Sequence, residues 1–267
     1  MQANHARMAG PALFGLVTAA LVFSAPPALA QGPSPTDHFK CYGATEATLE
    51  QPTTVTLTDQ FGVEPDVMVE NARWFCNPVT KIHGGVMTPI TEFENHLTLY
   101  PISNTNPEPT LSTNPDPARL VTISNQFGIQ DLVVTAPRLL AIPTTKVPFP
   151  PFRDISYFKC YEARSPALNE PVTLRDQFGI EEGVRVLAAT FFCNPAVKIV
   201  EGVPTFPEPL EAHLACYKIT PSEQPPVESV NIFNQFEPRG DTLTIGPSQY
   251  LCVPSEKLLV GTPSGQP

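Results

Sequence analysis

The sequence predicts an all-β fold of two tandem small β-sandwich or barrel modules, each of two internal quasi-repeats of about three strands. Three observations lead to this prediction. A set of motifs recurs four times, apolar and polar residues alternate at a period of two, and the cysteines are regularly dispersed. Helical periodicity does not extend beyond a turn or two, so we expect no long helix.

The best-preserved repeat spans residues 156–199 and combines three landmarks. It opens on an aromatic-flanked Cys-Tyr, continues through Asp-Gln-Phe-Gly and ends on Cys-x-Pro-x-x-Lys. The central motif recurs as Asp59-Gln60-Phe61-Gly62, Asn125-Gln126-Phe127-Gly128, Asp176-Gln177-Phe178-Gly179 and Asn234-Gln235-Phe236-Glu237. The first and third copies resemble each other most, as do the second and fourth. A period of two quarters therefore predicts two modules.

Each repeat contains a strand signal before its central motif. Residues 55–58 alternate apolar and polar, and 121–124, 172–175 and 230–233 do so in the other copies, with Phe233 as the one aromatic exception. The Gln-Phe-Gly that follows predicts a turn, because glycine supplies a positive φ and Asp or Asn can bond the nearby backbone. We expect the phenylalanine of each turn to fold back into the core.

Residues 1–30 have the pattern of a secretory signal peptide, with Arg7 before an apolar run and Ala28-Leu29-Ala30 before the cleavage point. The expected organisation then comprises a first β module, a proline-rich linker, a second β module and a flexible tail. These segments cover residues 31–146, 147–154, 155–258 and 259–267.

The mature chain is strongly acidic. Of 16 Lys and Arg only Arg7 lies in the leader, which has no acidic residue, so the mature net charge is -11. This surface argues against nucleic acid or anionic lipid as a partner, and we expect no membrane insertion after signal cleavage. The expected location is secreted or periplasmic.

Six cysteines in an exported chain are expected to pair. Spacing alone leaves three connectivities for the second module. Internal alignment selects one, because Cys216 corresponds to Leu99 and Cys252 to Ala141, as though one bridge were lost as a unit in the first module. The predicted disulfides are Cys41–Cys76, Cys160–Cys193 and Cys216–Cys252.

With its FKCY, DQFG and FCNPxxK motifs the chain resembles a family of secreted bacterial repeat proteins, known as a domain of unknown function. The resemblance covers essentially the whole mature chain. It implies no activity, cofactor or catalytic residue. The departures are Leu99 and Ala141 in place of cysteine, and Glu237 in place of glycine.

A repeated aromatic and imidazole face is the candidate ligand site. Strand alternation places its members on one face of the opening strands: His38, Tyr42, His96, Tyr100, Tyr157, Tyr161, His213 and Tyr217. Such a face suits stacking on sugar rings or binding a soft metal, and the alternative is a set of cross-strand pairs that stabilise the sheet. The alternative is favoured, so we expect neither metal nor cofactor.

Other residues have simpler interpretations. The terminal lysines Lys81, Lys146, Lys198 and Lys257 are expected to be solvated, and Asp59 and Asp176 to cap turns rather than bind calcium. Residues that break the repeat symmetry, where a catalytic site would have to lie, form no recognised set. They are Trp74, His83-Gly84-Gly85, Glu181-Glu182 and 103–117.

Function is expected to be non-enzymatic: an exported module that binds or scaffolds an unknown extracellular ligand or protein, such as a glycan or a cell-surface partner. Two alternatives remain open. One is a secreted hydrolase that uses Glu181 and Glu182 with a histidine, and the other is a purely structural envelope protein.

Overall fold

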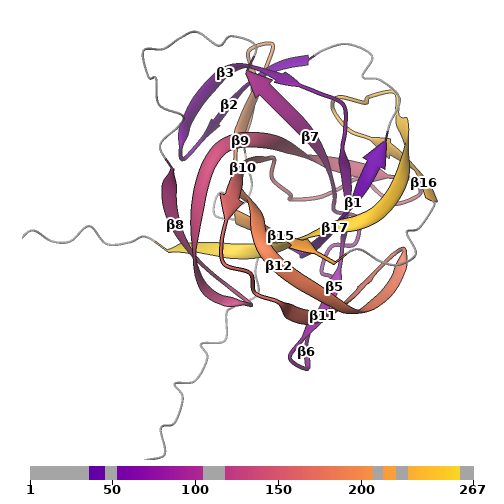
Figure 1. The fold of residues 1–267 in the computed structure, drawn as a ribbon. Coiled ribbons are helices and arrows are strands. Elements are labelled where there is room, and N and C mark those ends of the chain that lie inside the picture. Colours follow the sequence, from indigo (N-terminus) through magenta and orange to yellow (C-terminus); the bar gives the residue numbers. More distant parts are fainter. Residues whose placement is uncertain (1–35, 46–52, 105–117, 207–212, 221–227, 259–267) are drawn as a thin grey trace, which may run out of the picture. The chain divides into compact units, whose positions relative to one another are not determined.

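The computed structural model describes residues 36–45, 53–104, 118–206, 213–220 and 228–258. These residues form antiparallel strands and turns without any helix, which confirms the predicted all-β class (Figure 1). In this part of the chain there is accordingly no helix able to cross a lipid bilayer. The predicted signal peptide and C-terminal tail lie outside the described residues.

Four consecutive segments, here called quarters one to four, share one strand plan. Each has an opening strand, a hairpin strand and a return strand, and the Gln-Phe motif joins the last two. The opening strands are β1 (Phe39–Thr45), β7 (His96–Asn104), β10 (Phe158–Arg164) and β15 (His213–Ile219). The hairpin strands are β2 (Thr53–Asp59), β8 (Arg119–Asn125), β11 (Glu170–Asp176) and β16 (Glu228–Phe233). The return strands are β3 with β4 (Gly62–Val69, Trp74–Pro78), β9 (Gly128–Lys146), β12 (Gly179–Pro195) and β17 (Asp241–Leu258).

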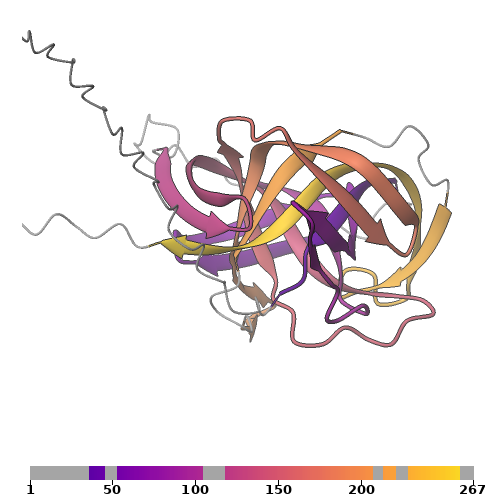
Figure 2. The ribbon, with the colours of Figure 1, turned by 90° about the horizontal axis from the view of Figure 1, so that it is seen from below.

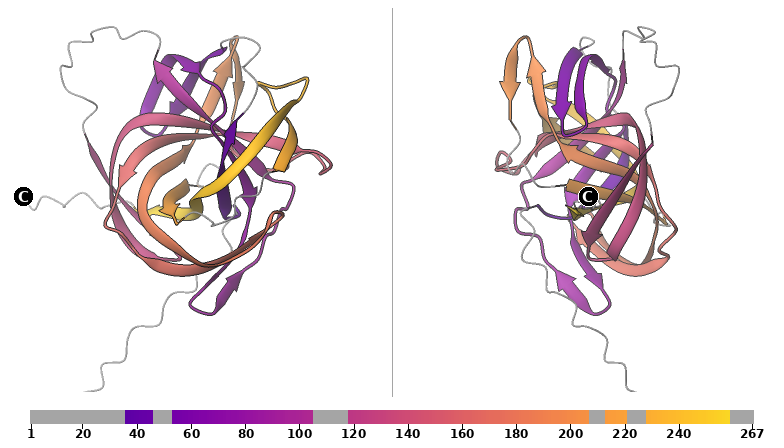
Figure 3. Two further views of the ribbon diagram at one scale, coloured as in Figure 1. Left: turned by 45° about the vertical axis from the view of Figure 1, so that its right-hand side comes forward. Right: turned by 90° about the vertical axis from the view of Figure 1, so that its left-hand side faces the viewer.

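Two short hairpins extend quarters one and three, and the motifs did not predict them. One consists of β5 (Thr80–His83) and β6 (Val86–Thr88), the other of β13 (Val197–Val200) and β14 (Val203–Thr205). Both extend away from the main body of strands (Figure 3).

Opening and return strands alternate around a closed ring in the order β1, β4, β7, β9, β10, β12, β15, β17 and back to β1 (Figures 1 and 2). Two tandem modules are therefore not confirmed. Strand β9 of the expected first module pairs with β10 of the second, and β17 pairs with β1. Closure gives each ring strand a partner on both sides, which removes open edges.

The interior of the ring is filled by side chains in three layers. The middle layer holds the three predicted disulfides, Cys41–Cys76, Cys160–Cys193 and Cys216–Cys252, which the structure confirms. The fourth equivalent position is the cross-strand pair Leu99 and Ala141. One flanking layer contains Phe39, Leu97, Phe158 and Leu214, and the other contains Trp74, Leu139, Phe191 and Tyr250. Alternation along each strand explains the layers, because every second residue faces inward.

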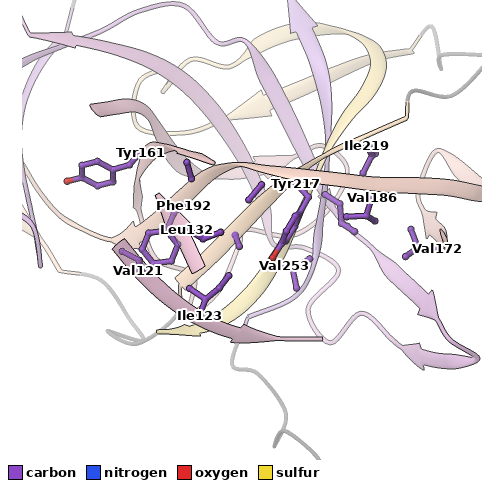
Figure 4. Packing of buried hydrophobic residues seen from close by; sticks show 14 of the residues in the cluster. Val121, Ile123, Leu132, Tyr161, Val172, Val186, Phe192, Tyr217, Ile219 and Val253 are labelled. Atoms are coloured by element: carbon purple, nitrogen blue, oxygen red, sulfur yellow. The ribbon is translucent and has the colours of Figure 1, made fainter. Parts of the chain in front are cut away.

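Hairpins cover the outer face of the ring, so the ring strands are buried on both sides. The hairpins of quarters two and three form one apolar cluster with β10, β12, β15 and β17 (Figure 4). Those of quarters one and four form a second cluster over β1, β4, β7 and β9. As expected, the phenylalanine of each turn packs against these clusters: Phe61 and Phe127 on the first, Phe178 and Phe236 on the second.

Each hairpin strand is covered in turn by the end of a return strand, or its extension, from two quarters away. Strand β5 pairs with β11 and β13 pairs with β2, while the last residues of β17 and β9 pair with β8 and β16. The quarters are therefore interlocked pairwise, one with three and two with four.

Candidate functional site

The side chains predicted to form a ligand face lie beneath the hairpins. Seven of the eight, namely His38, Tyr42, His96, Tyr100, Tyr161, His213 and Tyr217, are buried, and Tyr157 is half-buried. Each opening-strand tyrosine packs edge-on against a turn phenylalanine. The pairs are Tyr42–Phe178, Tyr100–Phe236, Tyr161–Phe61 and Tyr217–Phe127, with ring centroids 5.1, 5.3, 5.0 and 5.4 Å apart. This placement favours the sheet-stabilising interpretation.

Quarters one and three exchange equivalent contacts through their turn aspartates. Asp176 accepts a hydrogen bond from the Tyr42 hydroxyl at 2.7 Å and one from the Asn77 amide at 3.3 Å. Asp59 accepts from Tyr161 and Asn194, both at 2.9 Å. Each aspartate also caps its own turn, as predicted, by accepting from the backbone N–H two residues on. Burial, together with the nearby aspartate charge, raises the pKa of both tyrosines.

The same two quarters are also joined by two equivalent ion pairs, in which the lysines are buried and the carboxylates are half-buried. Lys40 of β1 lies 2.6 Å from Glu181 of quarter three, and Lys159 of β10 lies 2.7 Å from Glu64 of quarter one. Glu181 also accepts from the Ser248 hydroxyl at 3.2 Å, whereas Glu182 is exposed. The two carboxylates suggested for a hydrolase therefore lie in different environments.

Quarters two and four are joined by tyrosine–asparagine hydrogen bonds in place of the tyrosine–aspartate bonds of quarters one and three. Asn125 donates to Tyr217 at 2.8 Å and to Ser255 at 2.9 Å, and Asn234 donates to Tyr100 at 2.8 Å. Because asparagine donates where aspartate accepts, the tyrosine hydroxyl reverses its role. Copies one and three are thus alike because they dock on each other, and so are copies two and four. This reciprocal docking accounts for the alternation that had suggested two modules.

The predicted solvation of the terminal lysines is wrong for three of four. Lys81, Lys146 and Lys198 are buried, and only Lys257 is half-buried. Lys146 donates to the Oε1 atom of Gln177, and the amide nitrogen of the same glutamine contacts His96 Nε2. Burial lowers the pKa of Lys146 to about 8, and burial together with the Lys146 charge lowers that of His96 to about 4.

The equivalent lysine of quarter one is buried beneath an aromatic ring. The Lys81 Nζ atom is 4.3 Å from the Phe127 ring centroid and has no hydrogen-bond partner in the described part of the chain. Burial lowers its pKa to about 7. In quarter three, Lys198 Nζ lies 4.1 Å from the Tyr157 ring, and burial lowers its pKa to about 8. These lysines contribute to packing between quarters and offer no open contact surface.

The remaining symmetry-breaking residues are dispersed. His83 lies 3.3 Å from Glu170 and edge-on to Phe127, whereas Trp74 contacts Phe191, Tyr250 and Gln249. Of the 103–117 loop, only 103 and 104 are described, at the end of β7, and the rest lies outside the described residues. Within the described ranges no group of three or more His, Cys, Asp or Glu could hold a metal ion.

A groove opens at the seam, our name for the junction at which β17 pairs with β1. It has a volume of about 560 Å³ and is lined by residues 43–45, 71–74, 244–247 and Gln249. Ligand pockets in proteins typically have volumes of about 300–1,000 Å³. The ladder itself bends here, because Tyr42 pairs with Ser248 and Ala44 with Ile245, leaving 246 and 247 out of register. We call this the seam groove.

Two glycines keep the seam groove open. The junction of β9 with β10 is its internal equivalent, and there Glu162 occupies the position of Gly43 and Thr135 that of Gly246. Glu162 fills that junction by contacting Arg138 at 3.4 Å and Arg164 at 3.0 Å, and these hydrogen bonds lower its pKa. No such side chain projects from Gly43, so the space remains.

Trp74 forms one wall of the seam groove and is held from two directions. Its indole nitrogen donates to Gln249 Oε1 at 2.8 Å. Its ring also meets Phe191 and Tyr250 edge-on, at 6.4 and 5.7 Å between centroids. Trp74 was noted in the sequence as a break in the repeat. The glycines were missed, although their alignment with Glu162 and Thr135 was the available signal.

In comparisons with protein-family models, curated proteins and solved structures, nothing matches the chain. The seam groove therefore has to be interpreted from its own residues.

Proposed function

We propose that the chain is an exported, non-enzymatic binding protein and that the seam groove is its ligand site. One observation carries the proposal: the groove occurs where the repeat symmetry is broken by Gly43, Gly246 and Trp74. A shared scaffold requires the same packing in every quarter. A departure that opens a space beside the single tryptophan is better explained by a ligand than by stability.

The lining supports binding rather than acid–base chemistry. It offers the Trp74 ring, the hydroxyls of Thr45 and Thr244, the amide of Gln249 and the guanidinium of Arg73. Aromatic surface with a few polar groups is typical of small-molecule sites. Support for export comes from the three disulfides, which are typical of oxidising extracellular or periplasmic environments.

The test is to close the groove with the residues that fill its internal equivalent. In Gly43→Glu/Gln249→Arg, the new pair reproduces Arg138 and Glu162. A Cβ at Gly43 would meet only the flexible end of Gln249, 2.8 Å away, and that residue is replaced in the same variant. The fold should therefore persist, which far-UV circular dichroism checks.

Binding is followed by the emission of Trp74, the only tryptophan, during titration with a panel of soluble neutral and acidic oligosaccharides. The wild-type protein should respond to at least one member and the closed variant to none. Arg138→Gln/Glu162→Gly is the matched control, because it alters the equivalent junction and leaves the groove intact. Undiminished binding by the closed variant, or no response from the wild type, would contradict the proposal.

A further inference from the structure

Arg73 lines the seam groove with an exposed side chain, and no acidic residue in the described part of the chain forms an ion pair with it. Its internal equivalent is Arg138, which lies 3.4 Å from Glu162 on the neighbouring opening strand. The registers match, since Trp74 lies opposite Leu99 as Leu139 lies opposite Cys160. The position equivalent to Glu162 beside Arg73 is therefore Pro101. Proline offers no carboxylate, and no described carboxylate forms an ion pair with Arg73.

The backbone of Arg73 is fixed while its side chain is exposed. Its N–H donates to the Leu99 carbonyl at 3.0 Å, and its own carbonyl accepts from Ala44 at 2.9 Å. A guanidinium on a rigid backbone presents a defined fork of donors that matches a carboxylate. In a chain of net charge -10, an arginine that keeps no acidic neighbour provides local charge complementarity for an anion.

We infer that the seam groove binds a saccharide bearing a carboxylate, such as a uronic acid residue. This inference rests on the proposed function. The carboxylate of the ligand pairs with Arg73 and replaces the side-chain carboxylate that Pro101, at the position of Glu162, does not supply. The Trp74 ring packs against the sugar. Thr45, Thr244 and Gln249 supply the neutral donors and acceptors that hydroxyl groups require. That combination fits a sugar acid better than an acidic peptide, which presents few hydroxyls.

The probes are tri-galacturonic acid and its fully methyl-esterified form, in which a methyl group on each carboxyl removes the charge. Calorimetry and Trp74 emission should show the acid binding about tenfold or more tightly than the ester, as one charge-assisted contact implies. Arg73→Gln should reduce the affinity for the acid by a similar factor and leave that for the ester unchanged. Arg138→Gln is the matched control and should change neither. Added salt should weaken binding of the acid alone.

The outcomes separate the two proposals. Equal binding of acid and ester, lost in the closed variant, would overturn the carboxylate and leave the proposed function standing. Equal loss by Arg73→Gln and Arg138→Gln would show that surface charge in general, not this groove, attracts the acid. Equally tight binding of tri-glutamate would overturn the saccharide assignment. If neither saccharide alters Trp74 emission or releases heat, the uronic acid inference is wrong. The proposed function is then tested separately by the titration with the oligosaccharide panel.

Discussion

The hydroxyl of Tyr42 donates a hydrogen bond of 2.7 Å to Asp176, which lies 134 residues further along the chain. Both side chains come from repeated motifs, so the same bond is made in reverse by Tyr161 and Asp59. In these bonds the tyrosine of one repeat copy donates to the turn aspartate of another copy, and not to the aspartate of its own copy. The stability of each quarter therefore depends on a quarter that is not its neighbour in the chain.

Tyr42→Phe should lower the free energy of unfolding by about 1.5–3 kcal/mol, because it removes a donor to a carboxylate. Tyr217→Phe should cost about 1 kcal/mol, since among the described residues the hydrogen-bond partners of that hydroxyl are the neutral Asn125 and Gln130. Urea unfolding measures both. Tyr250→Phe is the control, because its half-buried ring packs against Trp74 and its hydroxyl has no hydrogen bond among the contacts described. A cost for Tyr250 equal to that for Tyr42 would contradict the argument.

Stability should rise between pH 7 and pH 9.5. Burial lowers the pKa of Lys81 from 10.5 to about 7, so in this range the unfolded chain binds the proton that the folded chain has released. The penalty for burying the charge is fully present below pH 7 and is relieved as pH rises toward 10.5. Lys146 and Lys198, with pKa values of about 8, act in the same direction.

Lys81→Met should remove part of this pH dependence, on the order of 2–3 kcal/mol between pH 7 and 9.5. Urea unfolding of the variant and the wild type at the two pH values gives the comparison. Lys257→Met is the matched control, because that lysine is half-buried and donates to Gln60 at 2.7 Å. An unchanged slope in Lys81→Met would mean that Lys81 is not the group responsible.

Leu99→Cys/Ala141→Cys should form a fourth disulfide. The two positions lie opposite each other in the β7–β9 ladder, as Cys216 and Cys252 do in the β15–β17 ladder. The new bridge would close the loop from residue 99 to residue 141, and closing a loop of roughly 40 residues is expected to stabilise the fold by up to ~4 kcal/mol if the geometry is unstrained. Intact mass and thiol titration detect the bridge. Leu99→Cys alone should retain one thiol and leave a poorer core. Two free thiols in the double variant would show that the position is not equivalent.

Removing Cys76 and Cys216 together should create a new bridge across the seam. The remaining sulfur atoms, on Cys41 and Cys252, are 3.8 Å apart in adjacent disulfides. In Cys76→Ser/Cys216→Ser, oxidation should join them, and peptide mapping without reduction would identify the product. Persistence of two thiols under the conditions that oxidise the wild type would argue against a close approach in solution.

Strand content, turn positions and disulfide pairing could be read from the sequence because each is a local or internally aligned signal. Val55 and Leu57 alternate with polar residues whatever strand lies beside them, and Leu99 aligns with Cys216 by simple comparison. Strand partners carry no such signal. The period of two identifies a buried face without naming its neighbour, so the pairing of β9 with β10 and of β17 with β1 was not foreseen.

The site was harder to predict, because burial depends on what the hairpins cover. Lys81 ends a motif at which a charge would ordinarily be solvated, yet Phe127 of another quarter covers it. The seam groove depends on an absent side chain at Gly43. The role of Gly43 can be recognised only when β17 is known to lie beside β1.

The pairing of β17 with β1 also bears on how the polypeptide reaches its native state. Phe39 meets Cys252, so strand β1 must wait for almost the whole chain to be synthesised before its second partner arrives. Contacts of such long sequence separation slow folding, and an unpaired edge invites association during the wait. Early local oxidation of Cys41 with Cys76 would hold that first strand against β4 in the meantime. In this view the bridges guide the order of assembly as well as stabilising its product.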